Sequence, residues 1–254
     1  MWDWLGQLET LRREKSPFAI ATVVGTSGST PRELGAKLLV QQDGRFFGTV
    51  GGGQLEQLVL RDARTVLTRG AAERFKYPLG PKAGQCCGGV MEVLIEPVGV
   101  GPRLFLFGGG HVAQALCQVL AETSFSVDLV EEREEWLHAP SLPVSVVRHA
   151  EPWEDFLSQS HWDAEKTFVA VMTHRHDLDE AILSAVLLKP TRYVGLIGSV
   201  TKWSRFKARL LEQGQTPGAL DRVHCPIGLP IGGKSPKEVA ISVAAELLQL
   251  FHRA

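Results

Sequence analysis

The sequence predicts an α/β protein in which a smaller N-terminal α+β domain, residues 1–100, precedes a C-terminal domain built on a parallel sheet, residues 101–254. Three observations predict it. A chain of 254 residues suits two domains better than one. Two prolines and two glycines lie within residues 97–102, a composition typical of a connector. After this connector strand-like and helix-like segments alternate, whereas before it strands outnumber helices.

The N-terminal segment is expected to contain two helices and a hairpin. Asp43-Gly44 separates two apolar, strand-like runs, which is a strong hairpin signal. Apolar residues at helical spacing predict an amphipathic helix near the N-terminus, and Gly70 closes a second helix. The expected strands are residues 18–24, 36–40, 45–49, 74–77 and 90–96, and the expected helices are residues 2–15 and 55–68.

The C-terminal segment alternates between strands and helices. The apolar run 103–107 is typical of a strand that is covered on both faces, and a helix follows it at 111–122. Asp177 and Glu180 predict a capped helix start, and Ser235 with Glu238 predicts another. The other expected strands are residues 126–130, 144–147, 167–171 and 193–197. This pattern predicts a doubly wound, Rossmann-like parallel sheet.

Composition and charge exclude several classes of protein. The chain has 27 Lys and Arg against 28 Asp and Glu, a formal net charge of -1, so no overall field draws it to nucleic acid or to an anionic membrane. We recognise no signal peptide and no run long enough to span a bilayer. Four cysteines, two of them adjacent, do not suit a disulfide framework. We expect reduced thiols and a cytoplasmic location.

A phosphate-binding turn is predicted where the first strand of the C-terminal domain meets its helix. Residues 108–113 fit the pattern G-x-G-x-x-A. Gly108 permits the tight turn, Gly110 lets a phosphate approach the backbone, and His111 opens the helix. Glu131 ends the second strand, about twenty residues on, where it can bind ribose hydroxyls. The alternative is a glycine-rich turn without a ligand.

Two loops of the N-terminal domain are candidates for binding an anion. Arg32 and Lys37 flank a loop between strands, where they can hold an anionic group or remain solvated. Gly51, Gly52 and Gly53 lie between a strand and a helix, where three glycines carry an entropic cost. Such a cost is understandable where backbone approaches a ligand or where amides line an anion site. We therefore interpret these glycines as a binding element.

Cys86 and Cys87 precede two further glycines, Gly88 and Gly89. A thiol in this setting suits the ligation of a soft metal or the acceptance of sulfur. The alternative is a small buried cysteine in a turn. The C-x-x-C spacing is absent and no histidine is near in sequence, so a zinc site is not expected.

Polar side chains also follow two strands of the predicted parallel sheet, at the edge where ligands of such sheets bind. His174 and His176 follow one strand, where they can ligate a metal, transfer a proton or only orient the loop. Ser199 and Lys202 follow another strand, and Arg205 lies on the next helix. Lys202 and Arg205 can bind a phosphate, or they belong to a solvated helix face.

The residue pattern of hydride transfer is missing. The sequence has only two tyrosines, Tyr77 and Tyr193, and neither belongs to a Tyr-x-x-x-Lys pair. It also contains no G-x-S-x-G and no Walker sequence. The glycine-rich turn therefore indicates a bound ligand more than it indicates an oxidoreductase.

Taken together, these residues resemble the XdhC/CoxI family, the xanthine dehydrogenase accessory proteins. The resemblance runs nearly from end to end through segments in the same order. In the first half these are residues 21–24, 28–32, 35–37, 48–53 and 87–89. In the second half they are residues 107–113, 173–174, 195–199, 202, 205–206, 225–229 and 233–240.

The resemblance implies a carrier of molybdenum cofactor with no redox role of its own. Such a protein binds the molybdopterin and holds it while a cysteine desulfurase helps to replace an oxo ligand by sulfur. It then passes the cofactor to an apo molybdenum hydroxylase of the xanthine dehydrogenase type. The resemblance also implies a homodimer. By this resemblance Cys87 is the thiol near molybdenum, with Cys86 second, and Arg32, Lys37 and Lys202 join the glycine-rich loops as candidates for the pterin phosphate.

The chain departs from the family pattern at three positions. Gly109 stands where Ala is commoner, Glu131 where Asp is commoner, and Arg175 interrupts a usual Thr-His-Asp-His. Two other functions stay open at this point. One is an NAD(P)-dependent oxidoreductase that uses the glycine-rich turn. The other is a scaffold between desulfurase and hydroxylase that binds no ligand.

Overall fold

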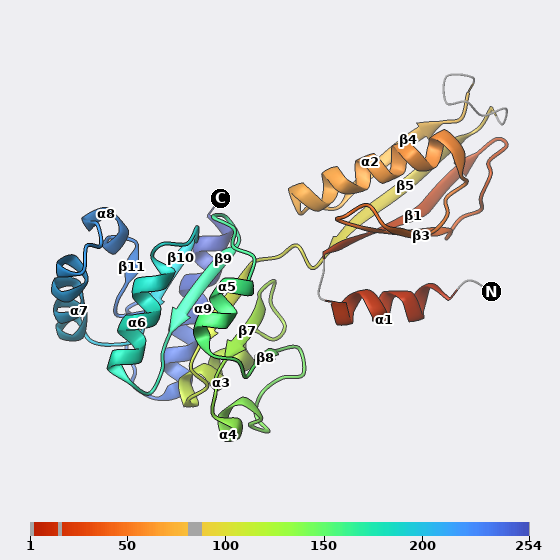
Figure 1. Cartoon of the computed structure of the whole chain (residues 1–254). Coiled ribbons are helices and arrows are strands. Elements are labelled where there is room, and N and C mark those ends of the chain that lie inside the picture. The colour runs from red at the N-terminus through yellow and green to blue at the C-terminus, as the bar shows by residue number, and fades with distance from the viewer. Residues whose placement is uncertain (1–2, 15–16, 81–87, 254) are drawn as a thin grey trace. The chain divides into compact units, whose positions relative to one another are not determined.

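The chain divides into two compact units, Met1–Gly101 and Pro102–Ala254 (Figure 1). The computed structural model describes residues 3–14, 17–80 and 88–253. Each unit has its own sheet and its own buried apolar clusters. Among the helices of these described ranges, none has both the length and the apolar character to cross a bilayer.

The N-terminal unit is a five-stranded antiparallel sheet with two helices. Its strand order is β3-β2-β1-β5-β4. The strands are β1 (Phe18–Ser27), β2 (Lys37–Gln41), β3 (Phe46–Gly48), β4 (Glu73–Pro78) and β5 (Val90–Val98), and the helices are α1 (Trp4–Glu14) and α2 (Gly53–Arg69). The predicted hairpin is confirmed, because β2 pairs with β3 and Gly44 turns between them at φ +92°. Gly70 ends α2 in the left-handed conformation, as predicted.

The two helices of this unit pack on opposite faces of its sheet. Alternate residues of a strand point to opposite faces, and β1 sorts its side chains accordingly. Ala19 and Ala21 join the core that contains Val59 of α2. Phe18 belongs to the opposite face and joins a smaller cluster with Leu11 of α1. One face of β1 therefore supports the main core, and the other anchors α1.

The C-terminal unit is a six-stranded parallel sheet with the order β11-β10-β9-β6-β7-β8. Its strands are β6 (Arg103–Phe107), β7 (Ser126–Val130), β8 (Val147–His149), β9 (Thr167–Val171), β10 (Tyr193–Leu196) and β11 (Val223–His224). Its helices are α3 (His111–Leu120), α4 (Glu134–Leu137), α5 (Trp153–Gln159), α6 (His176–Val186), α7 (Val200–Glu212), α8 (Pro217–Leu220) and α9 (Pro236–His252). Counted within the unit, this is the 3-2-1-4-5-6 order of Rossmann folds, so the predicted fold class is confirmed. The chain reverses its direction of winding between β6 and β9.

Helices cover both faces of this sheet. Leu104 and Leu106 of β6 belong to a core with α3 and α9, and Phe105 and Phe107 belong to a core with α5, α6 and α7. Because both faces are buried, the strands are apolar at successive positions rather than at alternate ones. Their carboxyl ends carry the loops described below.

Three details of the predicted elements are wrong, and each has a local cause. The strand expected at 144–147 forms at Val147–His149 instead, where His149 is held by two carboxylates. The short elements α4, α5, α8 and β11 have too few residues to show a period in sequence. The helix expected to start at Asp177 starts at His176, without a side-chain cap from Arg175. The capping box of Ser235 and Glu238 at the start of α9 is confirmed.

Candidate functional site

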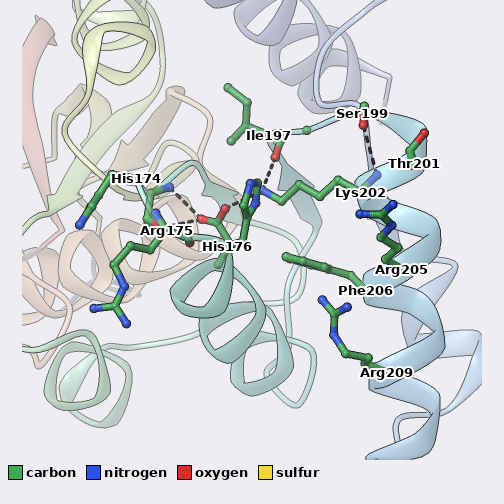
Figure 2. A pocket seen from close by; sticks show the side chains of 13 residues that line it. His174, Arg175, His176, Ile197, Ser199, Thr201, Lys202, Arg205, Phe206 and Arg209 are labelled. Atoms are coloured by element: carbon green, nitrogen blue, oxygen red, sulfur yellow. Dashed lines mark hydrogen bonds and ion pairs between the residues drawn. The ribbon is translucent and has the colours of Figure 1, made fainter.

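A hollow of about 560 Å³ opens at the carboxyl edge of β9 and β10 (Figure 2). We call it the basic hollow. It is lined by residues 173–176 and 179 from the start of α6, and by residues 197–199, 201, 202, 205, 206 and 209 from the start of α7. Six of these have basic side chains, namely His174, Arg175, His176, Lys202, Arg205 and Arg209. A hollow of this size at this sheet edge is typical of a small-molecule site.

An ion pair at the floor of the basic hollow ties its two sides together. The Lys202 ammonium donates to Asp179 at 2.6 Å and to the carbonyl of Ile197 at 2.9 Å. The other Asp179 oxygen accepts from the Thr173 amide at 2.9 Å and from its hydroxyl at 2.7 Å. Since the Asp179 side chain is 2% exposed and that of Lys202 is 11% exposed, this pair is shielded from water. Lys202, a predicted phosphate ligand, is therefore first a partner of Asp179.

The remaining cations of the basic hollow differ in their partners. Arg175 is paired with Asp177, and its hydrogen bond lowers the pKa of that carboxyl to about 2. Arg209 donates to Glu180 at 2.9 Å. Arg205 is exposed, and within the described part of the chain its side chain has no hydrogen bond and no carboxylate partner. Arg205 therefore brings an uncompensated positive charge to the basic hollow.

Figure 2 shows where these side chains point. Lys202, Phe206 and Arg209 extend from α7 toward the start of α6, and Arg205 lies close to α7 beside Lys202. The Phe206 ring has the Lys202 ammonium within 5.2 Å of its centroid and the Arg209 guanidinium within 5.1 Å. Ser199, another predicted ligand, accepts from the Lys202 amide as the N-cap of α7. These contacts hold the cations in place on a rigid helix.

A second hollow of about 230 Å³ adjoins the basic hollow. It lies between the ends of β6 and β9, where the winding reverses, and we call it the switch-point slot. It is lined by residues 107, 108, 130–133, 153, 173–175, 178 and 182. Residues 173–175 line both hollows, so His174 and Arg175 lie between them. The partly exposed apolar side chains of the slot are Trp153 and Leu178, and an aromatic wall of this kind favours a flat group.

The predicted phosphate-binding turn at β6 and α3 is built as expected in its backbone. Gly108 has φ +101°, and a Cβ there would lie 2.5 Å from the carbonyl oxygen of Met172. The glycine is thus required by the close approach of β9, whatever the ligand. Gly110 is the N-cap of α3, with open space around an added Cβ among the described atoms. His111 follows, with its ring edge-on to Trp136 at 5.1 Å.

Glu131 fills this turn with its own carboxylate. Its Oε2 accepts from the Gly109 amide at 2.8 Å and from Arg133 at 2.7 Å, and its Oε1 accepts from the amide and the Nε of Arg133. Burial acts to raise the pKa of this carboxyl, but these hydrogen bonds hold it below its ordinary value. A carboxylate has about four acceptor positions, so Glu131 has none left for ribose hydroxyls in this structure.

The two departures at Gly109 and Glu131 are linked in space. A Cβ at Gly109 would lie 3.1 Å from Cγ of Glu131 and 3.2 Å from Cβ of Trp136. Glutamate at position 131, which is longer than aspartate, therefore favours glycine over alanine at position 109. The third departure, Arg175, is the N-cap residue of α6 and pairs with Asp177.

In the N-terminal unit three glycine-containing loops meet. We call residues 28–31, 51–53 and 88–89 the glycine-loop cluster. Ser29 forms a backbone bridge with Gly88, and a Cβ at Gly89 would overlap the Ser29 carbonyl oxygen. A Cβ at Gly51 would lie 2.5 Å from Cγ of Pro31. The structure thus brings together segments that the sequence separates by about sixty residues at most.

The conformation of residues 51–53 is one that only glycine adopts with ease. Gly51, Gly52 and Gly53 have φ of +141°, +72° and +63°. Thr49 fastens the loop, because its hydroxyl donates to Glu56 at 2.6 Å and accepts from the Gly51 amide at 3.1 Å. Among the described atoms, a Cβ at Gly52 or Gly88 would meet nothing within 4 Å. Glycine at these two positions is therefore explained by backbone conformation and leaves room for a neighbouring group.

Arg32 and Lys37 line one hollow of about 400 Å³ in the same unit, together with Trp4, Gly35, Ala36, Gly48 and Thr49. The Lys37 ammonium donates to the Thr22 hydroxyl at 3.0 Å and lies 5.1 Å from the centroid of the Trp4 ring. Arg32 is exposed. The two predicted anion ligands are thus brought together, with Arg32 the more accessible.

The cysteines separate into two pairs. Burial raises the pKa of the Cys117 thiol to about 12 and that of Cys225 to about 11, the latter against the charge of Lys202. Neither is a thiolate near neutral pH. Cys86 and Cys87 lie outside the described residues. On either side of that segment, the Leu79 amide donates to the Gly89 carbonyl and the Gly88 amide donates to the Leu79 carbonyl.

Sequence reasoning missed three groups of this region, namely Asp179, Arg133 and Arg209. Asp179 lies in a predicted helix start, and nothing local reveals its bond to Lys202, 23 residues away. Arg209 and Glu180 are 29 residues apart. Arg133 offers a local signal, since it lies two residues after Glu131. Within the described ranges no three His, Cys, Asp or Glu side chains are grouped to hold a metal ion.

Comparisons with known proteins agree with the fold and identify the family. The model of the XdhC Rossmann domain matches residues 104–247, and the model of the XdhC and CoxI family matches residues 11–78. A solved structure described as a xanthine dehydrogenase from Bacillus halodurans is similar in fold, with a TM-score of 0.52 and 23% identity over 100% of this chain and 96% of that one.

Two curated relatives are similar in sequence. The uncharacterized protein YqeB of Escherichia coli is 33% identical over 96% of this chain and 45% of its own length. A protein of Bacillus subtilis, named as a probable xanthine dehydrogenase subunit, is 30% identical over 62% of this chain and 46% of its own length. This chain thus spans less than half of either relative. From its two family matches, one of which covers more than half of its length, the chain belongs to the XdhC/CoxI family.

Proposed function

We propose that this chain takes part in the maturation of a xanthine dehydrogenase-type enzyme, and that it does so by carrying molybdenum cofactor. In this role it binds the molybdopterin as cargo and holds it during sulfuration by a cysteine desulfurase. It then releases the cofactor to an apo molybdenum hydroxylase. Family membership and the name of the Bacillus subtilis relative support the link to that enzyme.

The observation that carries the cargo proposal is the glycine-loop cluster. It presents positive-φ backbone at Gly52 and Gly88, where no side chain fills the adjacent space among the described atoms. It also includes the glycines that directly follow Cys86 and Cys87 in sequence. Backbone without side chains allows close approach by a bulky cargo, and amides can hold its oxygens. A soft thiolate is a suitable ligand for a molybdenum–sulfur centre.

The charges and thiols of the described residues fit such a cargo. Arg32 and Lys37 share a hollow in the same unit and can hold the anionic phosphate of the pterin. Cys117 and Cys225 are kept protonated by burial, so Cys86 and Cys87 are the remaining thiols of the chain. We assign the contact with molybdenum to Cys87, with Cys86 as its neighbour. Gly51 and Gly53 of the same unit are part of the proposal as well. The ligands predicted in the C-terminal unit remain predictions from sequence, namely Gly108, Gly110, His111, Glu131, His174, Ser199 and Lys202.

A carrier has no catalytic role in hydride transfer. An NAD(P)-dependent oxidoreductase is less well supported, because Glu131 already binds the Gly109 amide and has its acceptor positions filled. Titration with NADH, followed by fluorescence, tests this alternative. Binding alone would not establish it, and turnover of the nicotinamide would.

A binding assay with released cofactor tests the cargo proposal. We expect Cys87→Ala to lower the affinity for molybdenum cofactor by at least about tenfold, since a metal–thiolate contact is lost. Cys225→Ala is the control, because it removes a half-buried, protonated thiol of the other unit. Equal affinity of wild type and Cys87→Ala would contradict the role of the thiol. Absence of binding by the wild type would contradict the proposal as a whole.

Partners and assembly follow from the same proposal. We expect a homodimer, a complex with the desulfurase and a complex with the apo-hydroxylase in the cytoplasm. A scaffold without cargo predicts that the complex with the hydroxylase forms equally well with cofactor-depleted protein. A carrier predicts that cofactor strengthens this complex. Size-exclusion chromatography of the partners with loaded and depleted protein distinguishes the two.

A further inference from the structure

We propose that the basic hollow and the switch-point slot together bind a phosphate monoester of a flat heterocycle, with its phosphate on Arg205. This binding concerns the C-terminal unit alone and does not rest on the cargo proposal. Its ligand class includes nucleoside monophosphates and phosphorylated pterins, which share the same chemistry. Three features support it: the unbalanced charge of Arg205, the shape of the switch-point slot, and the pairing of Glu131 at the turn from β6 to α3.

The charge of the basic hollow favours an anion. Among its lining residues there is one carboxylate, Asp179, and the Lys202 ammonium neutralises it at 2.6 Å. Arg175 and Arg209 are balanced by Asp177 and Glu180, which do not line the hollow. After this pairing the charge of Arg205 remains, among the described side chains. A guanidinium is suited to phosphate, because its fork of donors matches two phosphate oxygens.

The position of Arg205 places that charge within reach of further donors. Arg205 lines the hollow from α7, where it lies beside Lys202, and the neighbouring Phe206 ring is held between two further cations (Figure 2). The imidazoles of His174 and His176 line the opposite side. His174 has no partner among the described residues, so it can donate a further hydrogen bond to an anion. His174 and His176 thus add hydrogen-bond donors to the lining of the hollow.

The shape of the switch-point slot suits one part of a ligand. Its volume of about 230 Å³ is below the roughly 300–1,000 Å³ of complete small-molecule sites. Its walls offer the partly exposed side chains of Trp153 and Leu178 to a flat group, with the buried Phe107 and Val130 behind them. It opens beside His174 and Arg175, which also line the basic hollow. One ligand can therefore place a ring in the slot and a phosphate in the hollow.

The paired state of Glu131 is a reason not to expect a dinucleotide at the first turn. In dinucleotide-binding Rossmann folds the pyrophosphate lies on the first strand-to-helix turn and an acid binds the ribose. Here Glu131 occupies the Gly109 amide and the donors of Arg133. The acid that would bind the ribose is thus already taken, whereas the unbalanced positive charge lies at the end of β10, on Arg205. The ligand is accordingly a monophosphate rather than a dinucleotide.

Calorimetric titration of the full chain tests this inference. We expect 5′-AMP to bind with an affinity at least about tenfold above that of ribose 5-phosphate, because the ring adds contact in the slot. We expect Arg205→Gln to weaken 5′-AMP by about tenfold or more. Arg205→Lys should give an intermediate loss, since charge is kept and the fork is lost. Arg253→Gln, at the exposed end of the last helix, is the charge-matched control.

The outcomes are distinguishable. Arg205 is exposed and unpaired among the described residues, so its replacement should leave the circular dichroism and the melting temperature unchanged. Equal affinity of wild type and Arg205→Gln for 5′-AMP would overturn the inference. So would affinity for ribose 5-phosphate equal to that for 5′-AMP, or no saturable binding of either. Competition between 5′-AMP and released molybdenum cofactor then tells which source of the shared chemistry the hollow accepts.

Discussion

Two strand-to-helix turns of the C-terminal sheet differ in how their charges are balanced. The turn from β6 to α3 has the recognisable G-x-G-x-x-A pattern, yet its Gly109 amide and Arg133 are satisfied by Glu131. The turn from β10 to α7 has only Gly198 and Ser199, yet it opens on a hollow with an uncompensated Arg205. The glycine pattern therefore specifies a backbone path. The unbalanced charge of Arg205 is the feature from which we infer an anionic ligand.

Gly108 also shows that a glycine can be required by the backbone path and not by a ligand. Its Cβ position is 2.5 Å from the Met172 carbonyl oxygen, so the close approach of β9 already requires glycine. A ligand is not needed to explain it.

The largest effect is expected at the floor of the basic hollow. Asp179→Ala leaves the Lys202 ammonium and the Thr173 amide without their acceptor, in a site where both charges are shielded. We expect the free energy of unfolding to fall by about 3–5 kcal/mol, as for other broken buried pairs. Urea denaturation measures it. Asp177→Ala, which removes the exposed partner of Arg175, should change little, and a loss as large as that of Asp179→Ala would contradict this account.

A smaller effect is expected in the filled turn. Glu131→Gln keeps the shape of the side chain and removes the charge that Arg133 and Gly109 share. We expect a loss of about 1–3 kcal/mol in the free energy of unfolding. Because the folded pKa of Glu131 is below its ordinary value, its stabilisation is present above the unfolded pKa and is lost as pH falls through the folded one. Urea curves should therefore converge for wild type and variant as the pH is lowered through that range. A difference in the free energy of unfolding that does not change with pH would contradict the role of the Glu131 charge.

The pairing of Gly109 with Glu131 predicts a coupled effect. Gly109→Ala adds a Cβ that would lie 3.1 Å from Cγ of Glu131. We expect it to destabilise the protein by about 1 kcal/mol or more by overpacking. In the Glu131→Asp background the same change should cost less, with a coupling of about 1 kcal/mol in a double-mutant cycle. Additive losses would show that the two family departures are independent.

The smallest effect concerns the strand that supports Glu131. The Glu131 amide donates to the His149 carbonyl, and the His149 ring lies between Asp128 and Glu151 at 2.9 Å from each. Burial opposes the charged ring, but these hydrogen bonds raise the pKa of His149 above its ordinary value. Its stabilisation is therefore full below the unfolded pKa of about 6.5 and is lost as pH rises through the folded pKa. The free energies of unfolding of His149→Gln and wild type should converge above that folded pKa. A difference that persists there would contradict the role of the charged His149 ring.

Local chemistry made much of the fold predictable. The Asp43-Gly44 hairpin, the Gly70 helix end and the Ser235 capping box each depend on residues that are close in sequence, and each is confirmed. The parallel sheet was predictable because strands buried on both faces are continuously apolar. The start of α6 shows the limit, because the helix begins at His176, one residue before Asp177, and the predicted side-chain cap is absent. Asp179 in that run binds Thr173 and Lys202 instead, and this tertiary bond sets the local structure.

The candidate site was predictable by residue type more than by arrangement. Lys202, Ser199 and His174 all line the basic hollow, as their position after parallel strands suggested. Which cation is left unbalanced depends on carboxylates 23 and 29 residues away, and no spacing in the sequence reveals such pairs. The meeting of Ser29 with Gly88 is likewise a result of strand order, because β1 pairs with β5. The roles of Cys86 and Cys87 remain predictions from sequence.

Mass spectrometry of the ligand that co-purifies with the native chain tests the carrier role most directly. The chain should be isolated under mild conditions from cells that make molybdenum cofactor, alongside Cys87→Ala and the Cys225→Ala control. We predict a molybdenum-containing pterin phosphate on wild type and control, and its loss from Cys87→Ala. A nicotinamide dinucleotide in its place, or wild type without any pterin, would contradict the carrier role.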